Sequence, residues 1–257
     1  MGNVSRETKA VAIANQKGGV GKTTTAVNLS ACLHSMSKRV LLVDFDSQGN
    51  ATSGLGIRPK EGETVYDMLM AGSGASSYIV RTRFCHVLPA DTRLAAAEQE
   101  ISGREGRTGL LRAALEDVKD RFDFIFIDCP PSLGLLSING MAAGDTVLIP
   151  MQCEYYALEG LSQIIASMRT IKNGINPKID VEGILLTMFD GRTNLTIQVS
   201  EEIKKHFGKK VYKTVIPRNV RLSEAPSHGL PVIEYDRLSR GAEAYMAVAQ
   251  EFLARQE

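Results

Sequence analysis

Short apolar runs alternate along the chain with stretches of helical periodicity. The apolar runs are expected to be strands, at residues 10–14, 39–45, 122–127, 146–149 and 181–188. Between them, apolar side chains recur at intervals of three and four residues, which is the spacing of one buried helix face. The main helices are expected at residues 22–36, 110–118, 158–171 and 195–207. Because several of the strands are apolar on consecutive positions, both faces of their sheet should be covered.

This alternation predicts an α/β protein with a mainly parallel, twisted sheet and helices on both faces. Residues 52–108 are less regular: glycine-rich turns surround a short helix expected at 64–70, and an alanine-rich helix should follow Asp91. No internal repeat, low-complexity tract or linker divides the 257 residues. We therefore expect a short polar N-terminal extension at residues 1–9 and a single domain at residues 10–257.

The last expected helix, at residues 239–254, has its apolar side chains on one stripe: Ala242, Tyr245, Met246, Ala249, Phe252 and Leu253. A helix that lies on a membrane surface would carry a polar face rich in Lys and Arg. The opposite face of this helix instead carries Glu243, Gln250, Glu251 and Arg255. Packing against the core is therefore the favoured interpretation.

The composition excludes several classes of protein. Hydrophobic residues make up 44% and charged residues 23%, as in ordinary globular proteins. No signal peptide is expected, and because no apolar run reaches about 18 residues, no transmembrane helix is expected either. The four cysteines lie far apart with no C-x-x-C pair, which fits a cytoplasmic protein better than a disulfide framework.

A glycine-rich segment, NQKGGVGKTT at residues 15–24, lies between the first expected strand and the first expected helix. Glycines let backbone N–H groups curl around phosphate oxygens, and the helix N-terminus adds partial positive charge. In such a loop Lys22 would reach the β- and γ-phosphates, and the Thr23 hydroxyl would bind Mg²⁺. A turn that binds nothing is disfavoured by this placement, so the sequence predicts a P-loop NTPase fold.

Three acidic residues follow the expected strands. Asp44 and Asp46 should face the same side, above the carboxyl edge where α/β sheets bind ligands. Asp128 ends the run FDFIFID and, taken alone, is equally well explained as a helix cap. Three acids beside a phosphate loop favour a catalytic set that coordinates Mg²⁺ through water and positions an attacking water.

The loop departs from the pattern G-x-x-x-x-G-K-[ST], because Gln16 replaces the first glycine and an extra Lys17 precedes the glycine pair. This form resembles the deviant Walker A group of P-loop ATPases. The segments LLVDFDSQGNATSGLG, FIFIDCPPSLG, IPMQCEYYALEGL and PRNVRLSEAPSHGLPVIEYD extend the similarity. Together they resemble the ParA/Soj chromosome and plasmid partition ATPases over residues 10–254.

The resemblance implies a role for each site residue. ATP would be held by Lys17, Gly18, Gly19, Val20, Gly21, Lys22, Thr23 and Thr24, with Pro217 and Asn219 near the adenine. Mg²⁺ would be bound by Thr23 directly and by Asp128 and Asp44 through water. Asp46 would position the hydrolytic water, Asp44 and Lys22 would assist, and Lys17 would reach the partner subunit's phosphates across a dimer interface.

The resemblance further implies an ATP-bound sandwich homodimer that binds double-stranded DNA non-specifically, with Arg192 and Arg221 at the contacting positions. A ParB-type centromere-binding partner would stimulate slow hydrolysis and release the DNA. Residues 189–221 carry eight basic and three acidic side chains although the whole chain is only +1, and Lys204, Lys205 and Lys213 would extend the surface. A solvated helix surface is the alternative explanation.

Only about nine residues precede the first strand, so we expect no helix-turn-helix domain, sequence-independent binding and a nucleoid-associated, cytoplasmic location. A MinD-like membrane-associated positioning ATPase is the main alternative, although the last helix lacks the basic face that it needs. An iron–sulfur ATPase would need two suitably placed thiols, and only Cys129 lies near the expected interface. A switch that binds ATP without hydrolysis is disfavoured by the intact lysines and acids.

Overall fold

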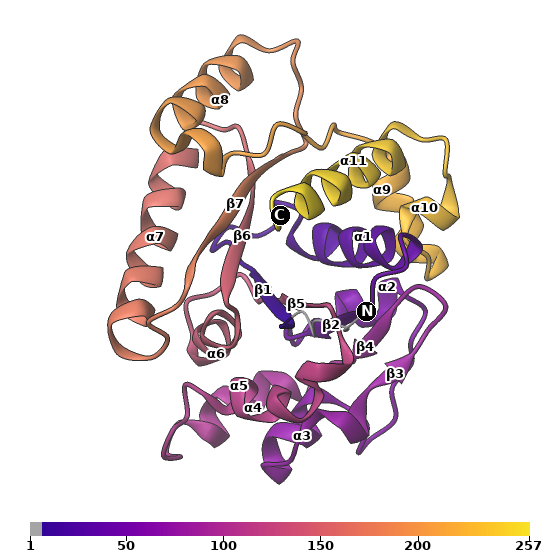
Figure 1. Cartoon of the computed structure of the whole chain (residues 1–257), viewed down its shortest axis with the longest axis vertical. Helices are drawn as coiled ribbons and strands as arrows, with labels where there is room; N and C mark the ends of the chain where they lie inside the picture. Colours follow the sequence, from indigo (N-terminus) through magenta and orange to yellow (C-terminus); the bar gives the residue numbers. More distant parts are fainter. Residues whose placement is uncertain (1–6) are drawn as a thin grey trace, which may run out of the picture.

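A computed structural model describes residues 7–257 of the chain. Within them, seven strands form one twisted sheet (Figure 1): β1 (Lys9–Ile13), β2 (Val40–Asp44), β3 (Val80–Arg81), β4 (His86–Leu88), β5 (Phe124–Asp128), β6 (Thr146–Gln152) and β7 (Asp180–Thr187). Their order is β3-β4-β2-β5-β1-β6-β7, and every neighbouring pair is parallel except β3 and β4. The predicted α/β fold with a mainly parallel sheet is confirmed.

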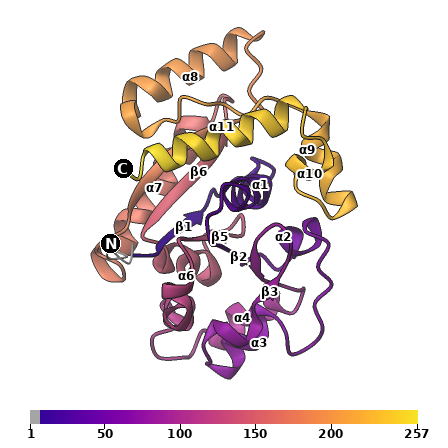
Figure 2. The ribbon, with the colours of Figure 1, turned by 45° about the vertical axis from the view of Figure 1, so that its right-hand side comes forward.

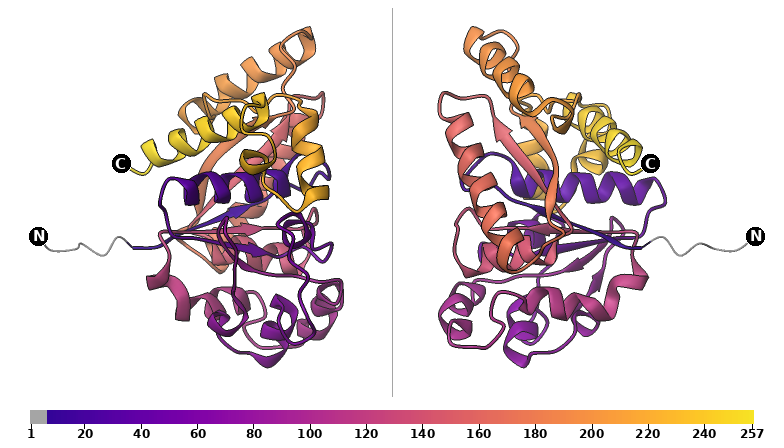
Figure 3. Two further views of the ribbon diagram at one scale, coloured as in Figure 1. Left: turned by 90° about the vertical axis from the view of Figure 1, so that its right-hand side faces the viewer. Right: turned by 60° about the vertical axis from the view of Figure 1, so that its left-hand side comes forward.

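Alternate side chains of each central strand enter two separate cores. Ala10 and Ala12 of β1 face one core, whereas Val11 and Ile13 face the other. The first core is covered by α3 (Val65–Ala71), α4 (Leu94–Ile101), α5 (Leu110–Leu115), α6 (Leu135–Ala143), α7 (Ala157–Gly174) and α8 (Asn194–Phe207). The second is covered by α1 (Lys22–Ser35), α2 (Asn50–Gly54), α9 (Val220–Glu224), α10 (Val232–Tyr235) and α11 (Arg240–Ala254). Figure 3 shows α1 and α11 on the face of the sheet opposite α3–α5.

Helix α11 lies across α1 and packs its apolar stripe into the second core (Figure 2). Phe252 meets Phe124 of β5 edge-on, with ring centroids 5.1 Å apart. The hydroxyl groups of Tyr245 and Thr25 lie 3.1 Å apart and join α11 to α1. Ser239 caps the helix by accepting a hydrogen bond from the N–H of Ala242. The interpretation of this helix as a core helix is therefore confirmed.

The structure differs from the expected elements in several places. The helix expected at residues 110–118 ends at Leu115 and continues as the 3₁₀ helix η2 (Glu116–Arg121). Three further 3₁₀ helices are η1 (Ala75–Tyr78), η3 (Gly208–Lys210) and η4 (Ala225–His228). The sequence reading did not name α6, which is buried on most of its circumference and so lacks a polar face. It also missed β3 and β4, which are only two and three residues long.

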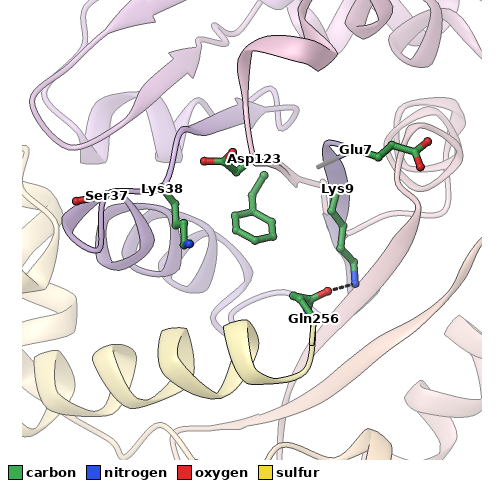
Figure 4. Close-up of a pocket in the computed structure, with 7 residues that line it drawn as sticks. Glu7, Lys9, Ser37, Lys38, Asp123 and Gln256 are labelled. Carbon is green, nitrogen blue, oxygen red and sulfur yellow. Dashed lines mark hydrogen bonds between the residues drawn. The ribbon is translucent and has the colours of Figure 1, made fainter. Parts of the chain in front are cut away.

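A pocket of about 290 Å³ opens at the amino edge of the sheet, where Lys9 donates a hydrogen bond to Gln256 (Figure 4). Its lining includes Lys38, Asp123 and Phe124, which precede or begin strands. None of the sequence-predicted site residues lines it. Among the described residues, no helix is both long and apolar enough to cross a membrane.

Candidate nucleotide-binding site

The glycine-rich loop connects β1 to α1 at the centre of the carboxyl edge of the sheet. Gly19 and Gly21 have φ angles of 73° and 89°, a left-handed conformation that residues with a side chain rarely adopt. Gly21 directly precedes α1, so the first N–H groups of that helix face the loop. The segment therefore has the backbone of an anion-binding loop.

Polar side chains from the ends of neighbouring strands hold the loop in place. Gln152, the last residue of β6, donates a hydrogen bond of 2.9 Å to the carbonyl of Gly19. Thr187, the last residue of β7, donates one of 2.7 Å to the carbonyl of Val20. The sequence reading missed both residues, although a polar side chain that directly ends an apolar strand is a signal that could have found them.

The two lysines of the loop are placed differently. Lys22 is buried and donates a hydrogen bond of 3.1 Å to the carbonyl of Lys17. Burial lowers the pKa of Lys22, while the nearby carboxylates of Asp128 and Asp46 act to raise it. The side chain of Lys17 is 55% exposed and forms an ion pair with Glu154, which follows β6. Lys22 thus faces the acidic residues of its own chain, whereas Lys17 lies at the surface.

The register of the sheet brings two of the acidic residues together. Asp44 and Asp128 end adjacent strands and pair with each other directly, and Asp128 also pairs with Ile13 at the start of the loop. Both alternate with residues of the first core, so both point to the face that α1 covers. The carboxylates therefore lie beside Lys22, the first residue of α1.

Asp128 fits a site for a cation. The residue is fully buried, and within residues 7–257 neither of its carboxylate oxygens has a hydrogen-bond partner. Burial raises the pKa of Asp128 well above its usual range, the Asp44 carboxylate raises it further, and the neighbouring Thr23 hydroxyl lowers it. A buried acid with free oxygens beside a hydroxyl is the oxygen-rich donor set that Mg²⁺ prefers.

The other two carboxylates are held by backbone and side-chain donors. Asp44 is fully buried, and this burial raises its pKa to about 6 although it accepts hydrogen bonds from Thr52 and Asp46. Asp46 lies beyond the end of β2, in a turn, and accepts a 3.0 Å hydrogen bond from the N–H of Gln48. All three carboxylates thus lie on one side of the phosphate loop. Asp44 and Asp128 end strands, whereas Asp46 lies on a turn.

A hollow of about 360 Å³ lies on the other side of the loop. Gly21 and Thr24 line it together with Pro217 and Asn219, the two residues expected near the adenine. Asn219 also caps α9, because its side-chain oxygen accepts a hydrogen bond from the N–H of Arg221. A base bound in this hollow would place its phosphates toward the loop.

The two arginines expected at DNA lie on segments that start side by side. Phe189 donates a hydrogen bond of 2.9 Å to the carbonyl of Ile216, so the segments that lead to Arg192 and Arg221 start side by side near the hollow. Arg192 is 89% exposed and, in the part of the chain that the structure describes, pairs with Asp190 alone. Arg221 is less free, because it pairs with Glu224 at 2.8 Å and Asp236 at 3.2 Å.

The three lysines expected at DNA are all exposed. Lys204 and Lys205 lie on α8, and Lys213 follows η3. Lys204 and Lys213 line one hollow between α8 and α11, whereas Lys205 lies outside that lining and approaches Glu202 at 3.5 Å. The structure thus brings two of the three lysines together.

Comparison with known proteins agrees with this site. A family profile described as an AAA domain matches residues 8–181. The sporulation initiation inhibitor protein Soj of Bacillus subtilis is 58% identical over 249 residues, which cover 96% of this chain and 98% of that protein. The chromosome partitioning protein ParA of Myxococcus xanthus is 50% identical over 250 residues, covering 96% and 88%.

A solved structure extends the comparison to a bound nucleotide. Cobyrinic acid a,c-diamide synthase from Mycobacterium smegmatis, with bound ATP analogue and magnesium, is 36% identical and superposes with a TM-score of 0.86. The match covers 97% of this chain and 96% of that one. The fold and the site therefore define a nucleotide-binding P-loop protein.

The higher and nearly full-length identity to partition proteins specifies the family. The chain belongs to the Soj/ParA family of chromosome-partitioning ATPases. The resemblance inferred from the sequence motifs is confirmed.

Proposed function

We propose that this protein is an ATP-dependent DNA-segregation ATPase whose ATP-bound dimer grips DNA and whose hydrolysis releases it. The observation that carries the proposal is the site itself: three carboxylates, a buried lysine and a phosphate loop converge beside a base-sized hollow. Such a set is suited to in-line attack of water on a terminal phosphate, with charge stabilised by lysine and Mg²⁺.

Within this proposal the site residues divide the work of binding and hydrolysis. The loop from Gly18 to Thr24 binds the phosphates, Lys22 neutralises their charge, and Pro217 and Asn219 contact the adenine. Thr23 and Asp128 hold Mg²⁺, Asp128 through water, and the cation screens the phosphate charges when it is bound. Asp46 orients the attacking water, and its place on a turn rather than in a strand leaves it within reach of that water.

A sandwich dimer accounts for the exposed side chains at this edge. Leu133, Tyr155 and Tyr156 are large apolar residues that follow β5 and β6 and remain 45%, 78% and 71% exposed. Lys17 lies beside them at the surface, held only by a half-exposed ion pair with Glu154. A second copy of the chain would cover the aromatic residues and give Lys17 the partner's phosphates as a new anionic contact.

The proposal of DNA binding rests on the exposed basic side chains of residues 189–221. Arg192, Arg221 and the lysines Lys204, Lys205 and Lys213 lie on segments that begin at the end of β7 or at η3. In a dimer the positive charge is doubled, and it would engage the DNA backbone without reading bases. A ParB-type partner would then act by accelerating hydrolysis, and the protein would work on the nucleoid in the cytoplasm.

The MinD-like membrane role has less support. Its membrane helix would need an apolar face free to enter the headgroup region. Helix α11 uses that face in the second core, where Tyr245 and Phe252 are fully buried.

Sedimentation velocity and phosphate release with Mg-ATP test the enzymatic part of the proposal. The wild type and Asp46→Ala should both form a dimer with ATP, while turnover by the variant falls at least about a hundredfold. Asp180→Ala is the matched control, because Asp180 pairs with Lys210 at the amino edge of the sheet. Turnover that survives Asp46→Ala would contradict the assignment.

A further inference from the structure

A buried threonine outside the phosphate loop is hydrogen-bonded to the carboxylate of Asp44. Thr52 of α2 is 2% exposed, and its backbone N–H and its hydroxyl both donate 2.7 Å hydrogen bonds to one oxygen of Asp44. The Thr52 hydroxyl in turn accepts a 2.9 Å hydrogen bond from the N–H of Ala90. Because Ala90 occupies its acceptor side, the single hydroxyl hydrogen is directed at Asp44.

The same network reaches the turn that carries Asp46. The other oxygen of Asp44 accepts a 3.3 Å hydrogen bond from the N–H of Asp46. Later in the turn, Gly49 has a φ of 61°, and a Cβ there would lie 3.2 Å from the carbonyl of Ala90. The turn is therefore held by Asp44 on one side and packed against Ala90 on the other, and Thr52 joins these two supports.

We propose that Thr52 is a positioning residue for hydrolysis: it locks the Asp44 carboxylate and thereby fixes the turn from which Asp46 orients the attacking water. The inference rests on the proposed ATPase function. Thr52 is neither part of the phosphate loop nor among the residues that line the hollow at Pro217 and Asn219. It should therefore affect the rate of turnover and not the affinity for nucleotide. Loss of its hydroxyl leaves the Ala90 N–H without a partner and Asp44 with one donor fewer.

The test removes the Thr52 hydroxyl while keeping the shape of the side chain. Thr52→Val removes it, and Thr52→Ser restores it. Thr146→Val is the matched control, because the Thr146 hydroxyl also donates a 2.7 Å hydrogen bond to a buried carboxylate, that of Glu182, at the other end of the sheet. Two readouts are measured on the full chain: kcat and KM for Mg-ATP, and amide hydrogen exchange of residues 44–52 without nucleotide.

Thr52→Val should lower kcat about ten- to a hundredfold with KM changed less than about threefold, the range typical for removing a group that orients an active-site residue. Exchange at residues 44–52 should become at least about tenfold faster. Thr52→Ser should restore both readouts, and Thr146→Val should alter neither.

Three results would overturn the inference. Unchanged kcat with faster exchange would make Thr52 a structural residue only. A raised KM with unchanged kcat would place it in nucleotide binding. Unchanged exchange would remove the link to the turn. If the wild type itself fails to hydrolyse ATP, the proposed function fails instead, while the exchange of Thr52→Val still decides whether Thr52 anchors the turn.

Discussion

The carboxylates of Asp44 and Asp128 at the proposed site are buried more deeply than their charge would favour without a ligand. Asp44 and Asp128 are both fully buried and lie in adjacent register positions, so each disfavours ionisation of the other. In the proposed function, a cation bound at Asp128 would relieve this conflict. The nucleotide-free site therefore opposes folding at neutral pH.

Because burial raises the pKa of Asp44 to about 6, the destabilisation caused by its buried charge depends on pH over a defined range. An acid whose pKa is raised on folding stabilises the protein below its unfolded pKa, and that stabilisation is lost as pH rises through the folded value. Without nucleotide, Asp44→Asn should therefore be more stable than the wild type at pH 7.5 by about 1–3 kcal/mol. The difference should shrink between pH 6 and pH 4 in urea unfolding.

Asp123→Asn provides a control of opposite sign. Hydrogen bonds from Arg39 lower the pKa of Asp123 against the opposing effect of its partial burial, so this variant should be less stable than the wild type at pH 7.5 and equal to it near pH 2. If Asp44→Asn instead destabilised the protein at pH 7.5, the view that burial opposes the Asp44 charge would be wrong.

For single residues, the sequence predicted the members of local motifs better than the residues that hydrogen-bond to them. Lys22, Asp44 and Asp128 could be located because a glycine-rich loop or an apolar strand adjoins each in the sequence. Thr52, Gln152 and Thr187 were missed. A polar residue at the end of an apolar strand signals the last two, but it does not show which residue each one binds: Thr187 donates its hydrogen bond to Val20, 167 positions away. Such pairings depend on strand order, which periodicity does not determine.

Among the elements, α11 joins the end of the chain to the centre of the sheet. Phe252 is fully buried and packs on Phe124 and Phe126 of β5, the strand that ends in Asp128. Phe252→Ala should lower the free energy of unfolding by about 3–5 kcal/mol because it leaves a cavity. Urea unfolding measures this change.

Leu238→Ala is the control for the α11 variant, since Leu238 is 88% exposed just before the helix and should change stability by less than about 0.5 kcal/mol. A loss at Phe252 no larger than the loss at Leu238 would contradict the core assignment of α11.

The elements that sequence reasoning found are those with a clear period. The last helix was predicted to within one residue at its start, because its apolar stripe has a polar opposite face. Strands β3 and β4 were missed because two or three residues give no period, and α6 because it is apolar on nearly all sides. The boundary between α5 and η2 could not be placed because the spacing of apolar residues is similar in an α-helix and a short 3₁₀ helix.

At the scale of the whole molecule, the proposed nucleotide site lies next to one of the arginines proposed to contact DNA. Pro217 lines the hollow, and so do Leu222 and Ser223 of α9, the helix that carries residue 221, which is expected at DNA. Arg221→Glu should leave ATP-dependent dimerisation intact and weaken DNA binding at least about tenfold, with a shallower dependence of log affinity on log salt. Fluorescence anisotropy with a duplex at several salt concentrations measures both.

Arg39→Glu is the matched charge reversal, because Arg39 is a half-exposed, ion-paired arginine at the amino edge of the sheet. It should leave DNA affinity within about twofold of the wild type. Equal losses in the two variants would indicate a general charge effect rather than a DNA-binding face around Arg221.

The central claim is that ATP switches this protein onto DNA and hydrolysis takes it off. The most direct test is a gel shift with a non-specific DNA duplex, comparing ATP, ADP and no nucleotide, on the wild type and Asp46→Ala. We expect binding with ATP alone, and stronger binding by Asp46→Ala because its ATP-bound dimer persists. Binding that is absent in every condition, or equal in all three nucleotide states, would contradict it.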